Sequence, residues 1–491
     1  MPPLNATGAR VQVGRAVLRT PGLAGTASEI PPGGSTQRAA TLSSNELETV
    51  LAAHNVTRQQ VIELRDTREV DAGGSPTRST RLDGTVIELE VPDPGPKFGQ
   101  VVLATDEAGI VNWSLARDQT GALATSRGAG GSRTYLIKRT VGAAPTGPGS
   151  RGVIGAIGKK LLQVLVFPLI DPVLGAVAEG YARTWEQAHR PYQVRTFTTD
   201  NYTQPGSPID EHDWGRLAAG RSLLFVHGTF ARAHGAFPTL PRSVMQQLEQ
   251  TYGGRLFAFD HYTVSEDPLD NARRLAASMP EGLKLDLDIV CHSRGGLVAR
   301  ALAESSELQL AGRELRIGRV AFVASPNGGC VLADPDGMSH FIDRYSNWVN
   351  FIPAGPVIDM LEGVVTVAKL LAVGAMKGLV GLESMVPHGG YLTKVNAGSP
   401  ASAHYFALAS NYEPTDQNLR SFAHNLLMDQ IFGTENDLVV PTAGVYDANG
   451  AGSFPIAADD RHVFAAADGI DHGGFFANPA AQTKLLEWLV G

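Results

Sequence analysis

The sequence predicts an α/β fold, in which a mainly parallel sheet is flanked by helices and joined by a helical insertion and an N-terminal region with a small β unit. Three observations predict it. From Arg221 to the C-terminus, apolar strand-like runs alternate with helical patterns, which is typical of a parallel sheet covered on both faces. Residues 330–400 interrupt this alternation with an apolar helical pattern. Residues 83–141 hold short alternating runs, as antiparallel strands do.

The first part of the chain predicts an arm followed by a small domain. Residues 1–42 are rich in Pro, Gly, Thr and Ala without a period, so we expect a flexible arm. Capping boxes at 43–46 and 57–60 predict two short helices. The runs DGTVIELEV, FGQVVLATDE and RTYLIKRTV are separated by turn residues and predict strands. Residues 43–145 are therefore expected to form an accessory domain of short helices and a β unit.

Residues 146–200 are expected to form a helical connector. A stretch rich in Pro and Gly at 143–152 is the best candidate for a linker. After it a helical pattern continues to His189, broken at Pro168 and Pro172. Its apolar run LLQVLVFPLI is too short to span a bilayer. We assign no chemistry to this first part of the chain, which is expected to serve as a scaffold or an oligomerisation module.

The remaining elements alternate in the order that a parallel sheet requires. The run RSLLFVHGTF predicts a buried strand that ends at His227, and residues 256–259 and 320–324 predict two more strands. Residues 268–279 place apolar side chains on one face of a helix. Further strands are expected in HYFALASNY and HVFAAA, with a last helix in PAAQTKLLEWLV.

The segment DIVCHSRGGLVAR at 288–300 predicts a strand, a tight turn with Ser293 at its apex, and a helix. Such a turn presents a serine hydroxyl above the sheet edge, and the following helix N-terminus favours developing negative charge. The residues two before and two after the serine must be small, because the turn brings strand and helix close together. Gly295 meets this demand, and Cys291 stands where glycine is usual.

Two backbone N–H groups are candidates for binding a developing oxyanion. One belongs to Thr229, after the strand that ends in His227-Gly228, and the other to Arg294, the residue after the serine. His227 is expected to stabilise the loop that carries the first donor. His292 is expected to pack at the top of the sheet and not to act as a second base.

From Arg221 to the C-terminus the chain resembles the α/β-hydrolase superfamily, specifically its bacterial lipase and esterase branch. The resemblance rests on HGTF, CHSRGG, SPNGG, NDLVVP and DHGGFF in that order. It implies an α/β-hydrolase catalytic domain over 201–491, with Ser293 as nucleophile, Asp437 as acid and His472 as base. His462 and His424 compete with the histidine. The competing acids are Asp416, Glu435, Asp468 and Asp471.

The insertion at 330–400 is expected to be a helical cap or lid. Its polar residues form one narrow stripe on a helix, with a wide apolar face around it. The members of that stripe are Asp359, Glu362, Thr366, Lys369 and Lys377. A cap over the serine would receive acyl chains on its apolar underside. Alternatively, the helix packs on the sheet edge and makes no contact with substrate.

Composition narrows the class of protein. The 491 residues carry a formal net charge of −8 and no basic block, which argues against nucleic acid as a partner. Two cysteines cannot build a disulfide framework, and the first residues do not read as a signal peptide, so we expect a cytoplasmic protein. No transmembrane segment, metal or cofactor is implied, and His234 and His261 show no ligand spacing. The oligomeric state stays open, including a homo-oligomer through the N-terminal region.

These observations lead to a carboxylic ester hydrolase (EC 3.1.1.-) that acts through an acyl-enzyme on an acyl ester or lipid-like substrate. The sequence does not distinguish a lipase from an esterase or a polyesterase. The alternatives are an acyltransferase or thioesterase in the same fold, or an N-terminal binding or assembly module that carries a regulated hydrolase domain.

Overall fold

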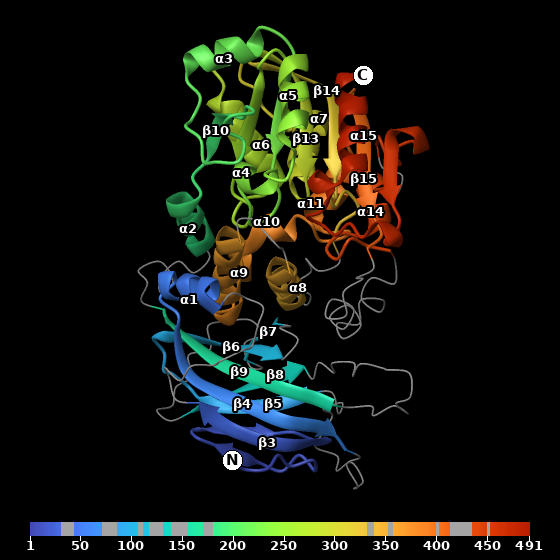
Figure 1. Cartoon of the computed structure of the whole chain (residues 1–491). Helices are drawn as coiled ribbons and strands as arrows, with labels where there is room; N and C mark the ends of the chain where they lie inside the picture. The colour runs from blue at the N-terminus through green and yellow to red at the C-terminus, as the bar shows by residue number, and fades with distance from the viewer. Residues whose placement is uncertain are drawn as a thin grey trace.

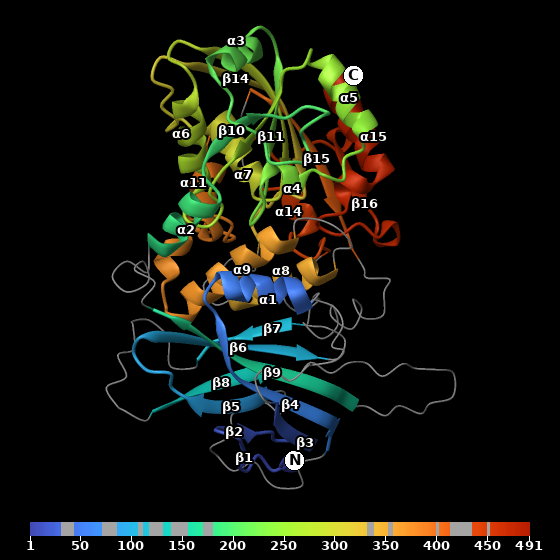
Figure 2. The same ribbon diagram turned by 60° about the vertical axis from the view of Figure 1, so that its left-hand side comes forward.

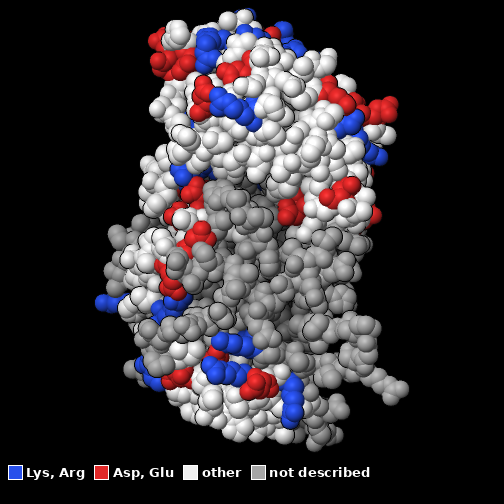
Figure 3. All heavy atoms as spheres, in the orientation of Figure 1, with Lys and Arg blue, Asp and Glu red and all other residues white. Residues whose placement is uncertain are grey.

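The computed structural model describes residues 1–30, 44–70, 86–106, 111–116, 131–138, 156–169, 180–330, 338–351, 357–398, 402–412, 435–448 and 452–491. An α/β unit lies at one end of the molecule and a β unit at the other, with the helices α8 (Met338–Phe351) and α9 (Val357–Ala372) between them (Figure 1). On the face drawn in Figure 3, basic and acidic side chains are intermixed.

The α/β unit is built on a seven-stranded sheet with the order β10-β12-β11-β13-β14-β15-β16. Every neighbouring pair from β12 to β16 is parallel, and only β10 runs antiparallel to its neighbour. The strands are β10 (Gln193–Thr196), β11 (Ser222–Val226), β12 (Leu256–Asp260), β13 (Lys284–His292), β14 (Glu314–Val323), β15 (His404–Ser410) and β16 (Arg461–Phe464). This order and direction are those of an α/β-hydrolase fold, as the sequence predicts.

Helices cover both faces of this sheet. Residues of β11 alternate between two cores, so that Leu224 and Val226 face one and Leu223 and Phe225 face the other. The first core is closed by α3 (Glu211–Ala218), α6 (Pro268–Ser278) and α7 (Gly295–Glu304). The second is closed by α5 (Arg242–Thr251) and α15 (Pro479–Val490). Two short helices, α4 (Ala233–Ala236) and α14 (Thr442–Tyr446), lie in loops after strands.

The N-terminal unit is a sandwich of two antiparallel sheets. One sheet has the order β1-β2-β5-β8 and the other β3-β4-β9-β6-β7. The strands are β1 (Val11–Val13), β2 (Ala16–Arg19), β3 (Leu23–Ile30), β4 (Thr57–Glu69), β5 (Val86–Pro92), β6 (Phe98–Asp106), β7 (Val111–Ser114), β8 (Ser132–Lys138) and β9 (Ala156–Pro168). The predicted strands in DGTVIELEV, FGQVVLATDE and RTYLIKRTV correspond to β5, β6 and β8.

Three predictions for this region are wrong. The expected arm at 1–42 contains β1 to β3, which pair with each other, with β4 or with β5. The expected helix at 57–60 is the start of β4, because pairing with β3 and β9 overrides a local capping signal. The expected helical connector at 146–200 contains β9, the middle strand of its sheet. The linker expected at 143–152 lies outside the described residues.

The apolar residues of β9 fit a buried helix as well as a buried strand, for a physical reason. The sheet is covered on both faces along residues 161–167, so this part of β9 is apolar except for Gln163 and lacks the alternation of a half-exposed strand. Leu162 and Val164 face the core inside the sandwich, whereas Leu165 and Phe167 face a core shared with the helices above. Within the predicted connector, only α2 (Tyr181–His189) is a helix among the described residues.

The inserted helices form a layer between the two units. Beside α8 and α9 stand α1 (Ser44–Ala53) and η3 (Met376–Leu379), which continues into α10 (Val380–Glu383), whereas α11 (Gly390–Asn396) packs on α7. Figure 2 shows α1, α8 and α9 lying over β6 and β7. The polar stripe of α9 faces protein instead of solvent: Lys369 is 2% exposed, and its Nζ donates to His54 O and Tyr181 Oη, 3.1 Å away in each case. The insertion is therefore a layer between the two units.

Candidate active site

Ser293 lies at the turn between β13 and α7, the place that the sequence predicts. Its φ is 53°, a left-handed value that non-glycine residues adopt rarely, and its N–H donates to Val323 O over 2.9 Å. A Cβ on Gly295 would lie 2.4 Å from Val226 O, so only glycine allows this approach of helix to strand. Cys291 is fully buried two residues before the serine.

Three side chains from distant loops form one chain of contacts. Ser293 Oγ lies 3.0 Å from His472 Nε2, and His472 Nδ1 lies 2.9 Å from Asp437 Oδ2. Exposure is 2% for Ser293, 0% for His472 and 1% for Asp437. With Nδ1–H donating to the carboxylate, Nε2 is left to accept the serine proton. The structure thus brings together the three residues that the resemblance implies.

Asp437 is held by its own loop. Its Oδ1 accepts the N–H groups of Val439 and Val440 at 3.0 and 2.7 Å. Its backbone carbonyl accepts the N–H of His472 over 3.0 Å. Hydrogen bonds therefore fix both ends of the acid relative to the histidine.

The competing residues lie in other arrangements. His462 is the second residue of β16, and its ring packs on Phe464, with centroids 4.4 Å apart. Asp471 and Asp468 each accept a backbone N–H of a residue two or three positions away. Glu435 is exposed, and His424 and Asp416 lie outside the described residues.

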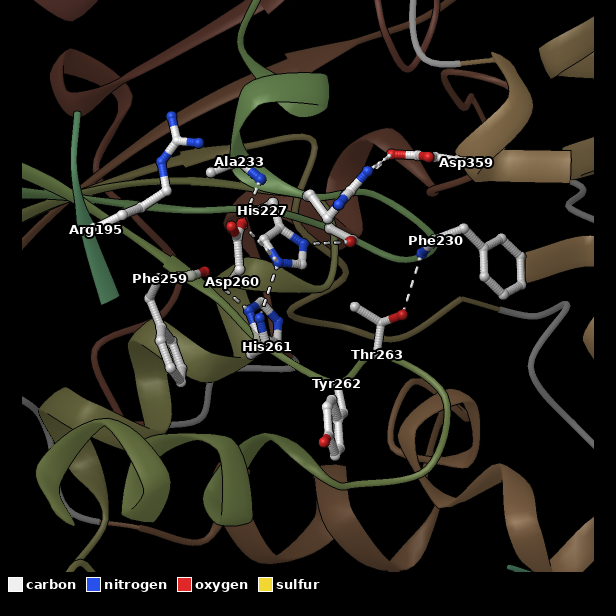
Figure 4. Close-up of polar contacts among 12 residues, drawn as sticks. Arg195, His227, Phe230, Ala233, Phe259, Asp260, His261, Tyr262, Thr263 and Asp359 are labelled. Carbon is white, nitrogen blue, oxygen red and sulfur yellow. Dashed lines mark hydrogen bonds and ion pairs between the residues drawn. The ribbon is translucent and has the colours of Figure 1, made fainter. Parts of the chain in front are cut away.

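The loop after β11 is fixed by His227, as Figure 4 shows. The side chain is fully buried, its Nδ1–H donates to Gly228 O over 2.9 Å, and its Nε2 accepts the N–H of His261 over 3.1 Å. Burial lowers the pKa of His227 to about 3, so the imidazole stays neutral at physiological pH. A Cβ on Gly228 would lie 2.5 Å from the Cβ of Ser293, so this loop passes directly against the serine.

The loop after β12 supports the loop after β11. Thr263 Oγ1 accepts the N–H of Phe230 over 3.2 Å, a contact drawn in Figure 4. The buried carboxylate of Glu186, in α2, in turn accepts the N–H groups of Thr263, Val264 and Ser265. Glu186 was not predicted, because no residue near it in the sequence indicates that it binds a loop about 80 residues further along the chain.

The side chain of Arg294 also joins these parts. Its guanidinium is fully buried and donates to Gly381 O, Tyr262 O, Asn271 Oδ1 and Glu266 O. The backbone N–H groups of Thr229 and Arg294 are the predicted oxyanion donors. The loops that carry them both form hydrogen bonds with the loop after β12, through Phe230 N–H in one case and the Arg294 side chain in the other. His292 Nε2 contacts His472 O at 2.8 Å, and burial lowers the pKa of His292 to about 3. His292 therefore packs beneath the site as a neutral ring.

Tyr345 is a further site residue that the sequence analysis missed. It lies on α8, its ring contacts that of Phe230 with centroids 5.0 Å apart, and the side chains of Ser293 and Thr229 are close enough to affect the pKa of its phenol. Burial raises the pKa of Tyr345, so the phenol keeps its proton. Tyr345 lies in the insertion, where no sequence motif around it indicates a place near the serine.

Two other features bear on the predictions. Among the residues that the structure describes, one group has carboxylate and imidazole atoms close enough to hold a metal ion, Asp210, His212 and Asp213. Asp210 and Asp213 form the capping box of α3, which accounts for their proximity. No described helix has the length and apolar character that crossing a bilayer requires.

Comparison with known proteins gives the following similarities. The model of the family "Domain of unknown function (DUF7379)" matches residues 189–490. No match was found among curated proteins. The structure is similar to the mature lipase BlEst2 of Bacillus licheniformis, with 18% identity, a TM-score of 0.31 and coverage of 61% of this chain and 97% of that one. It is also similar to lipase 1 of Pelosinus fermentans, with 15% identity, a TM-score of 0.39 and coverage of 55% of this chain and 97% of that one. A third similar structure is EstA of Clostridium botulinum, with 12% identity, a TM-score of 0.39 and coverage of 60% of this chain and 97% of that one.

Proposed function

The chain belongs to the DUF7379 family, and we propose that it is a serine hydrolase that cleaves carboxylic esters through an acyl-enzyme. The observation that carries the proposal is the unbroken chain of contacts from Ser293 Oγ through His472 to Asp437, at 3.0 and 2.9 Å. A buried carboxylate, imidazole and hydroxyl in this order supply a base, its partner and a nucleophile.

In the first step, Ser293 Oγ forms a bond to the ester carbonyl carbon while its proton moves to His472 Nε2. The carbonyl oxygen becomes an oxyanion, for which the N–H groups of Thr229 and Arg294 are the proposed donors. Asp437 stabilises the imidazolium. The bond from carbon to the leaving oxygen then breaks, and the proton on His472 passes to that oxygen, which leaves as an alcohol.

In the second step, water attacks the acyl-enzyme. His472 takes a proton from the water, the new oxyanion collapses, and Ser293 leaves with the proton returned to its Oγ. The product is a carboxylic acid. A thioester would react by the same steps, and an alcohol in place of water would make the protein an acyltransferase.

Aromatic side chains favour an apolar acyl group. The ring of Phe230, next to Thr229, lies 6.0 Å from that of Phe341 and 5.0 Å from that of Tyr345, centroid to centroid. Phe230 comes from the loop after β11 and Phe341 from α8, so the inserted helix and the loop beside the serine share one apolar cluster. We therefore propose the inserted helices as the cover under which an acyl chain binds.

The proposal is tested by ester turnover in two variants. Wild-type protein and Ser293→Ala are compared on p-nitrophenyl butyrate and palmitate, and the substitution should remove several orders of magnitude of turnover. Ser222→Ala is the matched control, because Ser222 is a fully buried serine at the far end of the sheet, where its Oγ donates to Leu217 O. It should keep wild-type turnover.

A fluorophosphonate probe gives an independent readout. It should label wild-type protein and Ser222→Ala at Ser293, and should leave Ser293→Ala unlabelled. Equal ester turnover in wild type and Ser293→Ala would refute the proposal. Rates on a matched thioester, and with added alcohol as acceptor, then separate an esterase from a thioesterase or an acyltransferase.

A further inference from the structure

Helix α8 has two faces with different chemistry. Asp343, Ser346 and Asn347 follow one another at intervals of three and one and so share one side of the helix. Phe341 and Tyr345, four residues apart, lie on the opposite side. Both faces are buried, so each has a partner in the molecule.

The polar face binds the N-terminal unit. Asn347 exchanges two hydrogen bonds with the backbone of Val111, since its Oδ1 accepts the N–H over 2.8 Å and its Nδ2 donates to the carbonyl over 2.6 Å. Asp343 Oδ1 accepts the N–H of Trp113 over 2.5 Å, and Ser346 Oγ accepts the indole N–H of Trp113 over 2.9 Å. These four hydrogen bonds, which we term the β7 clamp, fasten α8 to the edge strand of the sandwich.

The aromatic face reaches the serine. Tyr345 is 1% exposed, and its ring packs between Phe230 and Phe341, with centroids 5.0 and 4.8 Å away. Its ring contact with Phe230, the residue after Thr229, places the phenol next to the loop after β11, and the Ser293 and Thr229 side chains are close enough to affect the phenol's pKa. The phenol therefore lies on the side of the serine where the proposed donor of Thr229 lies.

We propose that Tyr345 is a catalytic residue that donates a third hydrogen bond to the oxyanion, and that the β7 clamp of the N-terminal unit positions it. This inference rests on the proposed ester hydrolysis. On this proposal the N-terminal unit positions a catalytic side chain, although no atom of the unit contacts the reacting group.

The chemistry follows from which oxygen carries charge. Before attack, the phenol has Ser293 Oγ as a neighbour. Once Oγ has bonded to the carbonyl carbon it is an ether-like oxygen and a weak acceptor, whereas the oxygen on the same carbon is now an anion. That anion lies beside Thr229, so it becomes the strongest acceptor within reach of the phenol.

The clamp explains why this donor would be effective. A preorganised donor in a water-excluded site needs no reorganisation during the reaction. The four bonds of the clamp are all buried, and moving the helix away would break its hydrogen bonds to the backbone of Val111 and Trp113. The structure therefore favours a fixed helix over a swinging lid.

The first test is Tyr345→Phe in the full-length protein. It should lower kcat on p-nitrophenyl butyrate by about 10²-fold, as the loss of one oxyanion donor does, with KM little changed. Tyr202→Phe is the matched control, because it removes a buried phenol that donates to Leu240 O over 2.9 Å, away from Ser293. The control should keep the wild-type kcat.

The second test is a double-mutant cycle on the clamp. Asn347→Leu removes both bonds to Val111, and Ser346→Ala is a milder change that removes the acceptor of the Trp113 indole. Each should lower kcat with little effect on KM. Each should also have little further effect in the Tyr345→Phe background, because the clamp acts through that hydroxyl.

The outcomes separate the two proposals. Wild-type kcat, or a higher one, in Tyr345→Phe would overturn the catalytic role, and a higher value would show that the phenol blocks the serine. Effects of Asn347→Leu and Ser346→Ala that simply add to that of Tyr345→Phe would overturn the positioning role. Wild-type protein that neither turns over esters nor reacts with a fluorophosphonate would refute the proposed function, and this inference with it.

Discussion

Replacing His227 tests how the loop next to the serine is held. Both ring nitrogens are in hydrogen bonds, with Gly228 O at 2.9 Å and with the N–H of His261 at 3.1 Å, and the side chain is fully buried. His227→Leu has a similar volume but leaves the N–H of His261 unpaired, whereas Gly228 O still accepts the N–H of Ala231 over 3.4 Å. At about 1–3 kcal/mol for one unpaired buried group, it should lower the free energy of unfolding by about that amount at pH 7. His227→Gln retains an acceptor and should cost less.

The same substitution should change the response to acid. Burial lowers the pKa of His227 from 6.5 to about 3, so between these values the unfolded chain binds a proton that the folded protein refuses. The stability is complete above pH 6.5 and is lost as the pH falls towards 3. One pKa unit corresponds to about 1.4 kcal/mol, so at pH 5 wild-type protein should have lost about 2 kcal/mol through this group.

Neither leucine nor glutamine titrates, so both variants escape this loss. The difference in stability between wild type and His227→Leu should therefore shrink by about 2 kcal/mol from pH 7 to pH 5. Urea unfolding followed by tryptophan fluorescence at the two pH values measures it, and the other buried histidines cancel because all three proteins share them. An equal difference at both pH values would show that His227 accepts a proton in the folded state.

Two further substitutions test the site directly. Asp437→Asn should lower kcat by up to ~10⁴-fold, because the amide no longer stabilises the imidazolium of His472, and near-normal turnover would assign the acid to another residue. Gly295→Ala should reduce turnover and lower the free energy of unfolding by about 1–3 kcal/mol, since the added Cβ would lie 2.4 Å from Val226 O. Gly390→Ala is its control, because a Cβ there meets nothing within 4 Å; equal effects of the two substitutions would contradict the argument.

The parts of the site that are local in sequence could be predicted. Ser293 and Gly295 belong to one strand-turn-helix segment, and the demand for small residues around that turn leaves a mark in the sequence itself. Thr229, Asp437 and His472 were proposed because the motifs around them occur in a known order. In each case a few neighbouring residues carry the constraint.

The parts that depend on packing could not be predicted. Tyr345 and Glu186 act on loops that lie far away in the chain, and neither stands in a pattern that such a role requires. The strand β9 shows the same limit at the level of the fold. Its apolar run has the composition of a buried helix or a buried strand, and only pairing with β4 and β6 decides between them.

Removing the N-terminal unit should destabilise the α/β unit and the inserted helices. Apolar side chains of the sandwich, such as Leu103, Trp113 and Phe167, share one core with the inserted helices, and the β7 clamp fastens α8. A fragment that begins at Gly180 keeps Glu186 but exposes the undersides of α8 and α9. At about 1.5–3 kcal/mol for each buried apolar side chain, four newly exposed ones would cost roughly 6–12 kcal/mol, as much as the whole stability of a typical domain.

We therefore expect this fragment to lose near-ultraviolet circular dichroism, to bind the dye ANS, and to show far lower kcat than the full chain. Tyr345→Phe in the full-length protein serves as the reference, because it removes the hydroxyl without exposing apolar surface. A fragment that unfolds cooperatively and retains the full-length kcat would contradict the shared core and the positioning of Tyr345 together. In that case the N-terminal unit would be better explained as a separate binding or assembly module.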